Sequence, residues 1–189
     1  MIYPIVAYGD PVLRRKAETI TPDYPELKQL IADMFQTMEH AHGVGLAAPQ
    51  IGLSIRLIVV DATPFAEEDP KAAGFKKALL NPEIYREEGE EWAFNEGCLS
   101  FPGLHEDVSR LSVVHIRYMD EDGNAHDEVY DGYVARVLQH ECDHLNGKVF
   151  VDHLSSLRKA LLRRKLDNIA KGAVTADYKI KFGGKPKHR

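Results

Sequence analysis

Residues 140–144 read His-Glu-Cys-Asp-His and lie in a segment whose apolar residues recur with helical periodicity. Histidines four positions apart project from one face of a helix, so both imidazoles can reach the same cation. Glu141 is rotated by about 100° from His140, which suits a proton carrier beside the cation. The alternative is a helix with two incidental histidines, but burying both rings without partners would cost free energy. The motif therefore predicts a buried metal-binding helix.

Helical periodicity defines three segments of the chain. The central one begins near Tyr133 and stops at Gly147. Residues 25–41 form an earlier apolar stripe, with Pro25 suited to a first helical turn. A last amphipathic helix is predicted from about residue 155, with basic residues outward. Its apolar positions, predicted to face inward, are Leu157, Leu161, Leu162, Leu166 and Ile169.

The regions between these helices contain β-strand patterns. Strands are predicted at 56–61, 78–80, 108–120 and 126–130, the last two joined in a hairpin by the turn at 122–124. Residues 43–52 are predicted to be a glycine-rich loop, and residues 62–77 a surface loop. We therefore expect an α+β fold with mostly antiparallel strands around the central helix. The 189 residues suit one catalytic domain, residues 1–171, followed by a flexible basic tail, residues 172–189.

Charge is distributed unevenly along the chain. The net charge is −5, yet residues 155–189 hold eleven Lys/Arg and only two acidic residues. This segment is either an interaction tail or a solvated helix face with a lysine-rich end. There is no apolar run of the ~20 residues that span a bilayer and no signal-peptide pattern. Two cysteines do not make a disulfide framework, which favours a reducing compartment. Together these features predict a cytoplasmic protein without a membrane partner.

A catalytic metal site of this type needs a third protein ligand and one open position. Cys98, flanked by Gly97 in a predicted loop, is free to turn a thiolate toward the cation. Spacing alone leaves two alternatives. A downstream ligand, Asp152 or His153, would be typical of a zinc peptidase, and Cys98 would then be a small buried apolar residue.

Three segments resemble the signature motifs of the peptide deformylase family, in their order. They are Gly43-Val-Gly-Leu-Ala-Ala-Pro-Gln50, Glu96-Gly-Cys-Leu-Ser100 and Gln139-His-Glu-Cys-Asp-His-Leu-Asn-Gly147. Residues 10–14 also resemble the opening of that family, and the likeness covers roughly residues 4–155. The resemblance implies hydrolytic removal of the formyl group from N-formylmethionine at the start of newly made proteins, with release of formate.

The resemblance also implies the parts of the site. The metal ligands would be Cys98, His140 and His144, and a water in the fourth position would be the nucleophile. Glu141 would act as general base and then acid, and the Gln50 amide and the Leu99 backbone N–H would stabilise the oxyanion. The family usually works with Fe²⁺, whereas one sulfur and two nitrogens would on general grounds suggest Zn²⁺. We expect native Fe²⁺, with Zn²⁺ or Ni²⁺ replacing it in purified material.

The substrate pocket is also expected from the resemblance. The residues expected to bind the substrate are Val44, Gly45, Phe94, Gly97, Tyr133 and Val137. Glu96 and Arg110 are either an ion pair that braces the Cys98 loop or unrelated surface charges. His105 stands where many bacterial members carry an arginine that contacts the substrate, which puts that contact in doubt. Cys142 is expected to pack in the core.

Two other functions stay open on the residues alone. One is the zinc peptidase, and the other is a non-catalytic module whose Cys-His-His site is structural and whose basic tail binds nucleic acid. If the enzyme acts on N-formylmethionyl chains leaving the ribosome, the basic C-terminal helix and tail could contact ribosomal RNA through its phosphates.

Overall fold

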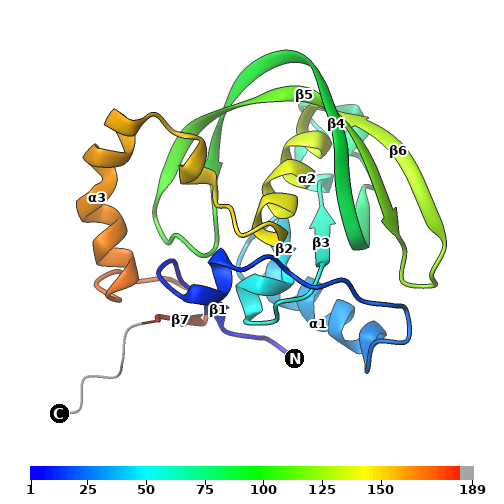
Figure 1. The fold of residues 1–189 in the computed structure, drawn as a ribbon, viewed down its shortest axis with the longest axis horizontal. Helices are drawn as coiled ribbons and strands as arrows, with labels where there is room; N and C mark the ends of the chain where they lie inside the picture. Colours follow the sequence, from blue (N-terminus) through cyan, green and yellow to red (C-terminus); the bar gives the residue numbers. More distant parts are fainter. Residues whose placement is uncertain (184–189) are drawn as a thin grey trace.

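The fold is built around a five-stranded antiparallel sheet that curves over one central helix. The structure is a computed structural model, and residues 1–183 of it are described (Figure 1). The strand order is β2-β3-β4-β5-β6, and Figure 1 shows β4 and β5 arching over α2. The strands are β2 (Gly45–Ala47), β3 (Leu57–Asp61), β4 (Lys76–Gly97), β5 (His105–Met119) and β6 (Ala125–Asp131). The predicted α+β architecture is confirmed.

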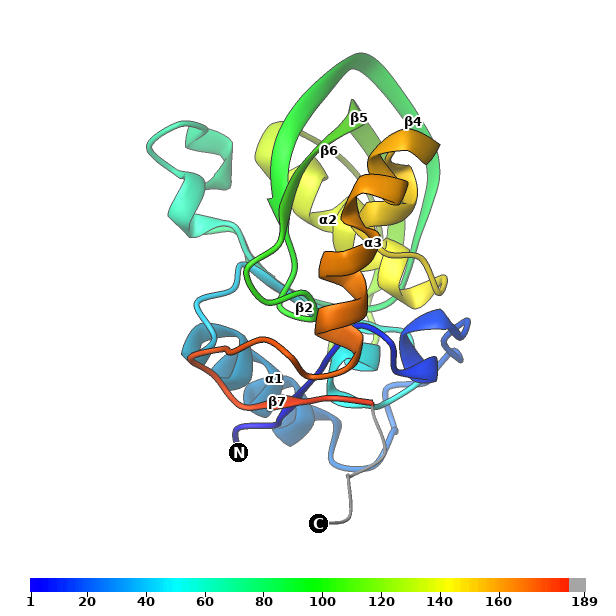
Figure 2. The same ribbon diagram turned by 90° about the vertical axis from the view of Figure 1, so that its left-hand side faces the viewer.

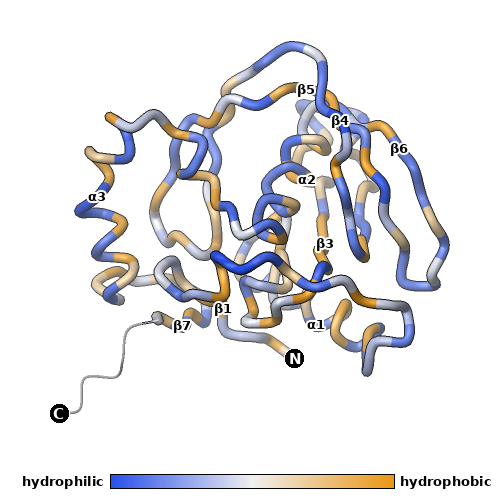
Figure 3. The backbone as a smooth tube through the Cα atoms, viewed as in Figure 1, coloured by the Kyte–Doolittle hydropathy of each residue, from blue (hydrophilic) through white to orange (hydrophobic). Residues whose placement is uncertain are grey.

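The three predicted helices are all present. They are α1 (Leu27–His40), α2 (Gly132–Leu145) and α3 (Ser156–Ala170). Helix α2 is the central one, and its apolar side packs into a core cluster shared with β3 and β5. Helix α1 packs in a second cluster with the other face of β3. The apolar run of β3 is visible in Figure 3 as an orange stretch between the two helices. None of the helices in residues 1–183 is both long and apolar enough to cross a membrane.

Strand β4 is the largest difference from the sequence prediction. The short strand expected at 78–80 continues through Asn81-Pro82 for 22 residues in all. Register shifts between Leu80 and Glu83, and again beyond Ile84 and Glu88, keep the strand paired with β5. The first of these shifts spans Pro82, which cannot donate a hydrogen bond to the neighbouring strand. Asn81 adopts a positive φ of 50°, and its side chain bonds the backbone N–H and C=O of Ile20 at 2.9 and 2.7 Å.

The prediction of a loop at residues 43–52 is also partly wrong. Residues Gly45–Ala47 form β2, which pairs with β3, and residues Ala48–Ile51 form a turn of 3₁₀ helix. Backbone pairing with Val60 and its neighbours orders this segment although its small side chains give no strand pattern. Residues 62–77 do contain the expected loop, with short 3₁₀ turns, before β4 begins at Lys76.

Helix α3 packs through a narrower face than predicted. Leu162 and Ile169 are buried, whereas Leu157 and Leu161 are 73% and 66% exposed. The prediction that all five apolar residues face inward is therefore wrong. Residues 162 and 169 lie seven positions apart on one line of the helix, and 157 and 161 are rotated by roughly 100–140° from it. The helix lies at one side of the molecule (Figure 1), so only that line meets the domain.

The segment after α3 returns to the domain. Strand β7 (Ile180–Lys181) pairs in parallel with β1 (Ile5–Val6). Figure 2 shows the chain turning back beneath α3 to reach β7. Within the predicted tail, residues 172–183 therefore lie against the domain, and residues 184–189 lie outside the described residues. The domain boundary at residue 171 stays a prediction.

Candidate active site

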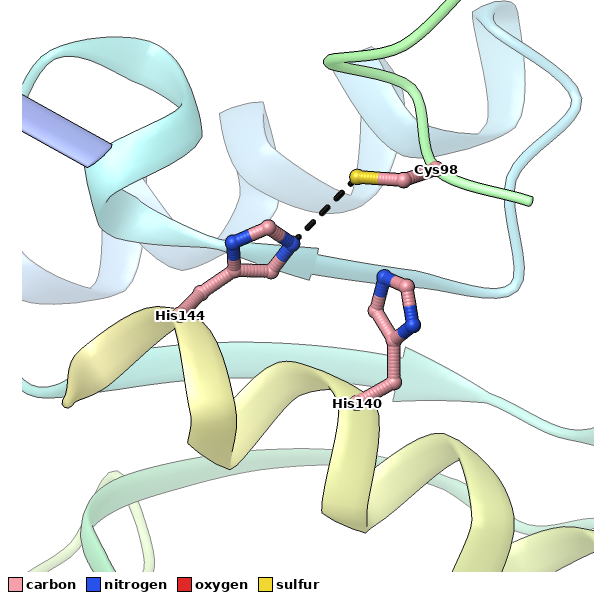
Figure 4. A group of neighbouring side chains, drawn as sticks. All are labelled: Cys98, His140 and His144. Carbon is pink, nitrogen blue, oxygen red and sulfur yellow. Dashed lines mark hydrogen bonds between the residues drawn. The ribbon is translucent and has the colours of Figure 1, made fainter. Parts of the chain in front are cut away.

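Three side chains from two distant segments meet beside α2 (Figure 4). His140 and His144 project from the helix, and Cys98 lies in the turn that follows β4. The candidate ligand atoms of these residues lie within 4.8 Å of one another, and Cys98 Sγ is 3.3 Å from His144 Nε2. The turn is closed by a 2.8 Å hydrogen bond from the Phe101 N–H to the Cys98 carbonyl. The end of β4 therefore places the Cys98 sulfur beside the two imidazoles.

The donor set and its surroundings fit a divalent transition metal. One thiolate and two imidazoles are ligands that zinc and iron accept. Burial, with the neighbouring His140, lowers the pKa of His144 to about 3, so its ring is neutral and has a lone pair to offer. One buried polar atom beside the group, Glu141 Oε2, has no hydrogen-bond partner among residues 1–183. Such an orphaned atom is costly unless a bound group, such as a water on the metal, satisfies it.

Glu96 anchors the other nitrogen of His140. Its carboxylate lies 2.9 Å from His140 Nδ1 and accepts hydrogen bonds from Arg110 at 2.7 and 3.1 Å. Of the two open interpretations of Glu96 and Arg110, the structure has the ion pair. Arg136, which the sequence analysis missed, also donates to Glu96 at 3.0 Å. Burial alone would raise the pKa of Glu96, but hydrogen bonds from His140 and Arg110 hold it well below its ordinary value.

Glu141 is buried and lines the same cavity as Cys98 and His140. Its carboxylate lies against the backbone of Gly45, where a β-carbon would collide with it. Burial raises the pKa of Glu141 to about 7. A carboxyl group with a pKa near neutrality can both take up and release a proton under working conditions. Gly45, predicted to approach the substrate, therefore also makes room for this carboxylate.

Gln50 is held with its amide nitrogen toward the cluster. Its Oε1 accepts from the Ala47 N–H at 2.8 Å, which orients the side chain. The Nε2 atom is then 3.4 Å from Cys98 Sγ and 3.3 Å from Ser100 Oγ. Leu99 follows Cys98 in the same turn, and its carbonyl accepts a 2.7 Å hydrogen bond from the Tyr178 hydroxyl. Burial raises the pKa of Tyr178 to about 12, so this hydroxyl stays protonated.

A cavity of about 410 Å³ opens beside these groups. Of the predicted substrate-binding residues, five line it: Val44, Gly45, Phe94, Gly97 and Val137. Tyr133 is not among its lining residues. Its ring instead stacks on Phe65 at 4.7 Å and meets Phe94 edge-on at 5.5 Å, so it supports the wall from behind.

Other wall residues were not anticipated. Phe65 comes from the 62–77 loop and Tyr178 from the C-terminal segment, and neither segment carries a motif that would identify them. His105 also lines the cavity, with its ring so close to Gly97 that a β-carbon there would collide with it. A histidine at this position thus packs on the Gly97 backbone at the cavity wall.

The alternative third ligands are engaged elsewhere. Asp152 forms an ion pair with Arg14, and His153 Nε2 lies 2.7 Å from Asp143. Among residues 1–183, the only group of three or more such side chains placed to hold a metal is Cys98, His140 and His144. Cys142 is buried in the core cluster, as expected, and burial raises the pKa of its thiol.

An α+β domain whose central helix presents His-Glu-x-x-His toward an apolar cavity is typical of metal-dependent hydrolases. A family model described as polypeptide deformylase matches residues 2–160. The peptide deformylase of Flavobacterium johnsoniae is 52% identical, and the alignment covers 100% of each chain. The crystal structure of peptide deformylase from Thermus thermophilus is 42% identical with a TM-score of 0.80, covering 91% of this chain and 99% of that one.

A crystal structure of a peptide deformylase from Legionella pneumophila is similar too, with 41% identity and a TM-score of 0.77 over 92% of this chain and 98% of that one. The chain therefore belongs to the polypeptide deformylase family, metal-dependent hydrolases that remove the N-formyl group from nascent peptides. The resemblance inferred from the three motifs is confirmed.

Proposed function

We propose that Cys98, His140 and His144 hold one divalent metal ion and that Glu141 carries the proton during hydrolysis of N-formylmethionyl peptides. The observation that supports this most is the meeting of three ligand atoms within 4.8 Å, beside a carboxyl group whose pKa is raised to about 7 by burial. The non-catalytic alternative needs a fourth protein ligand. No group of four such side chains is gathered there in residues 1–183.

The chain's own residues would divide the chemistry between them. When bound, the ion would lower the pKa of a water toward ~7 and polarise the formyl carbonyl. Glu141 takes the proton from the attacking water and later hands it to the leaving amine nitrogen, so that formate and a free amine result. Gln50 Nε2 and the Leu99 N–H donate to the formyl oxygen as negative charge develops on it.

The apolar cavity would receive the methionine side chain. Val44, Phe94 and Val137 give it an apolar wall, and Tyr133 supports Phe94 from outside the cavity. Gly45 and Gly97 carry no β-carbon at the wall, so a peptide backbone can approach closely there.

The identity of the metal is a separate part of the proposal. A ligand set of one thiolate and two imidazoles can bind iron, zinc or nickel. We propose that Fe²⁺ is the native ion and that Zn²⁺ or Ni²⁺ replaces it during aerobic purification. Metal analysis of anaerobically purified protein, alongside its specific activity, tests this. Full activity of the zinc form with no iron in the anaerobic sample would contradict it.

The basic surface of α3 supports a second part of the proposal, contact with ribosomal RNA in the cytoplasm. Arg163, Arg164 and Lys165 are exposed on this helix. Replacing all three with Glu should weaken co-sedimentation with ribosomes and reduce its salt dependence, because phosphate contacts release counterions. Deletion of residues 155–189 is a poorer test, since part of that segment lies at the cavity. Unchanged co-sedimentation of the triple variant would remove this part.

Formate release from a formyl-Met tripeptide tests the catalytic proposal. Glu141→Gln preserves the shape beside Gly45 but cannot carry a proton, so it should bind metal and lose nearly all turnover. Glu106→Gln is the control, because Glu106 is a nearly buried carboxylate paired with Arg158 and lies outside the cavity. Retained turnover in Glu141→Gln would contradict the mechanism. Cleavage of the unformylated peptide would favour the zinc peptidase.

A further inference from the structure

The C-terminal segment reaches the active site although it is remote from every motif. From residue 173 to residue 183, exposed positions alternate with half-buried ones. The half-buried positions are Val174, Ala176, Tyr178, Ile180 and Phe182. The segment bends at Val174, Asp177 and Tyr178 and is a strand only at Ile180–Lys181, so the alternation reflects a chain that lies along the surface with one face on the protein. Pairing of β7 with β1 holds the segment in place: the Ile5 and Ala7 N–H groups donate to the Lys179 and Lys181 carbonyls, each at 2.8 Å.

Tyr178 lies where this segment meets the cavity. Its side chain lines the 410 Å³ cavity and also an adjoining groove formed with Pro102 and Gly103. Its ring packs against the same apolar cluster as the Leu99 side chain. The hydroxyl donates to the Leu99 carbonyl at 2.7 Å, which is a well-formed hydrogen bond.

In the turn that carries Cys98 and Leu99, three successive backbone carbonyls accept hydrogen bonds. The Cys98 carbonyl accepts from the Phe101 N–H within the turn, and the Ser100 carbonyl accepts from the Tyr8 N–H, both at 2.8 Å. The Leu99 carbonyl is the one held by a side chain, and that side chain comes from the far end of the chain. The Leu99 N–H lies in the same planar peptide unit as the Cys98 carbonyl, and the Leu99 carbonyl lies in the next unit, joined to the first through the Leu99 Cα. Holding both carbonyls therefore limits the backbone rotations at Leu99 that would turn its N–H.

We propose that Tyr178 is a positioning residue for deformylation, whose hydroxyl holds the Leu99 carbonyl and so limits rotation of the backbone at Leu99, keeping the Leu99 N–H directed at the formyl oxygen. The inference rests on the proposed role of the Leu99 N–H. Donors aimed in advance at developing charge contribute most to rate acceleration, and small displacements of such groups are costly. Losing the Tyr178 hydroxyl should therefore slow the chemical step more than it weakens substrate binding.

Tyr178→Phe tests this, since it keeps the ring and removes only the hydroxyl. We expect kcat for a formyl-Met tripeptide to fall by about 3- to 10-fold, the size of one ordinary hydrogen bond. KM should stay within about 2-fold, because the apolar wall is retained. Inhibition by the deformylated tripeptide should not change, since that product has no formyl oxygen. Tyr3→Phe is the matched control: Tyr3 packs against the same apolar cluster and lies outside the cavity.

Rates are expressed per bound metal, and the melting temperature of each variant is compared with that of Tyr3→Phe. An unchanged kcat in Tyr178→Phe, with or without a rise in KM, would overturn the inference, because Tyr178 would then only line the cavity. A fall in kcat that is no longer seen when the rate is divided by the metal content would also overturn it, because the variant would then merely bind less metal. If the unaltered protein releases no formate, the proposed function itself fails. Full activity in the unaltered protein and in Tyr178→Phe contradicts only the role of Tyr178.

Discussion

Replacing Glu96 with Gln should reveal how strongly the ligand His140 depends on its carboxylate support. The substitution preserves size but removes the charge that faces three donors. Glu96 is 3% exposed and accepts from Arg110 at 2.7 Å and from Arg136 at 3.0 Å, and it lies 2.9 Å from His140 Nδ1. No other buried carboxylate in residues 1–183 contacts a residue of the metal-binding group in this way.

The size of the stability loss depends on which partners Arg110 and Arg136 keep when the Glu96 carboxylate is removed. Arg110 keeps an ion pair with Asp143 at 2.8 Å. Arg136 keeps no carboxylate partner within residues 1–183, but only hydrogen bonds to the carbonyls of Val108 and Trp92 and a place over the Trp92 ring at 4.4 Å. Breaking a buried ion pair by removing one partner costs about 3–5 kcal/mol. Loss of a carboxylate behind a ligating histidine lowers metal affinity about 10- to 100-fold. We therefore expect Glu96→Gln to lower the free energy of unfolding by about 3–5 kcal/mol and the metal affinity by about 10- to 100-fold.

Urea unfolding of the metal-free protein measures the first effect, and competition with a chelator measures the second. Glu106→Gln is the control for both: Glu106 is also nearly buried and binds Arg158 through two oxygens at 2.6 and 2.8 Å. Arg158 is half exposed and can be solvated, so the control should lose about 1 kcal/mol or less. Equal losses in the two variants, with equal metal affinity, would refute the reasoning.

Two further outcomes are expected. Gln50→Leu should lower kcat about 10²- to 10³-fold while metal content is retained, because one donor to the developing oxyanion is lost; steady-state formate release checks this, and a wild-type kcat would contradict it. In the metal-free protein, burial raises the pKa of Glu141 to about 7 from an ordinary 4.5. The folded state then holds this proton more tightly than the unfolded state, so its contribution is present below pH 4.5 and is lost as pH rises to 7. Glu141→Gln should therefore gain stability relative to the parent between pH 4.5 and pH 8, by up to roughly 3 kcal/mol; urea unfolding at both pH values tests this, and an equal difference at both would contradict it.

The parts of the site that are close in sequence could be predicted well. The spacing of His140 and His144 determines their common helix face, and the apolar period around them predicts α2 with its ends. The turn that carries Cys98 was also expected. The ion pair between Glu96 and Arg110 was one of two open interpretations, because the pairing of strands β4 and β5 that joins these residues cannot be derived from local pattern alone.

The missed features share a physical cause. Beyond residue 82, β4 extends past the core with most side chains exposed or half-buried, so an apolar alternation is absent and Asn81-Pro82 resembles a stop. Arg136 resembles an ordinary helical charge until Glu96 is placed beside it. Alternation of apolar and polar residues in 174–182 was a usable signal for a segment with one face on the protein, but lysines on its outer face made it resemble a solvated tail.

X-ray absorption at the zinc edge of protein reconstituted with Zn²⁺ tests the central claim, that Cys98 shares one ion with His140 and His144. We predict one sulfur near 2.3 Å and nitrogen or oxygen ligands near 2.0–2.1 Å, and Cys98→Ala should lose the sulfur. A shell of nitrogen and oxygen alone in the unaltered protein would contradict the account.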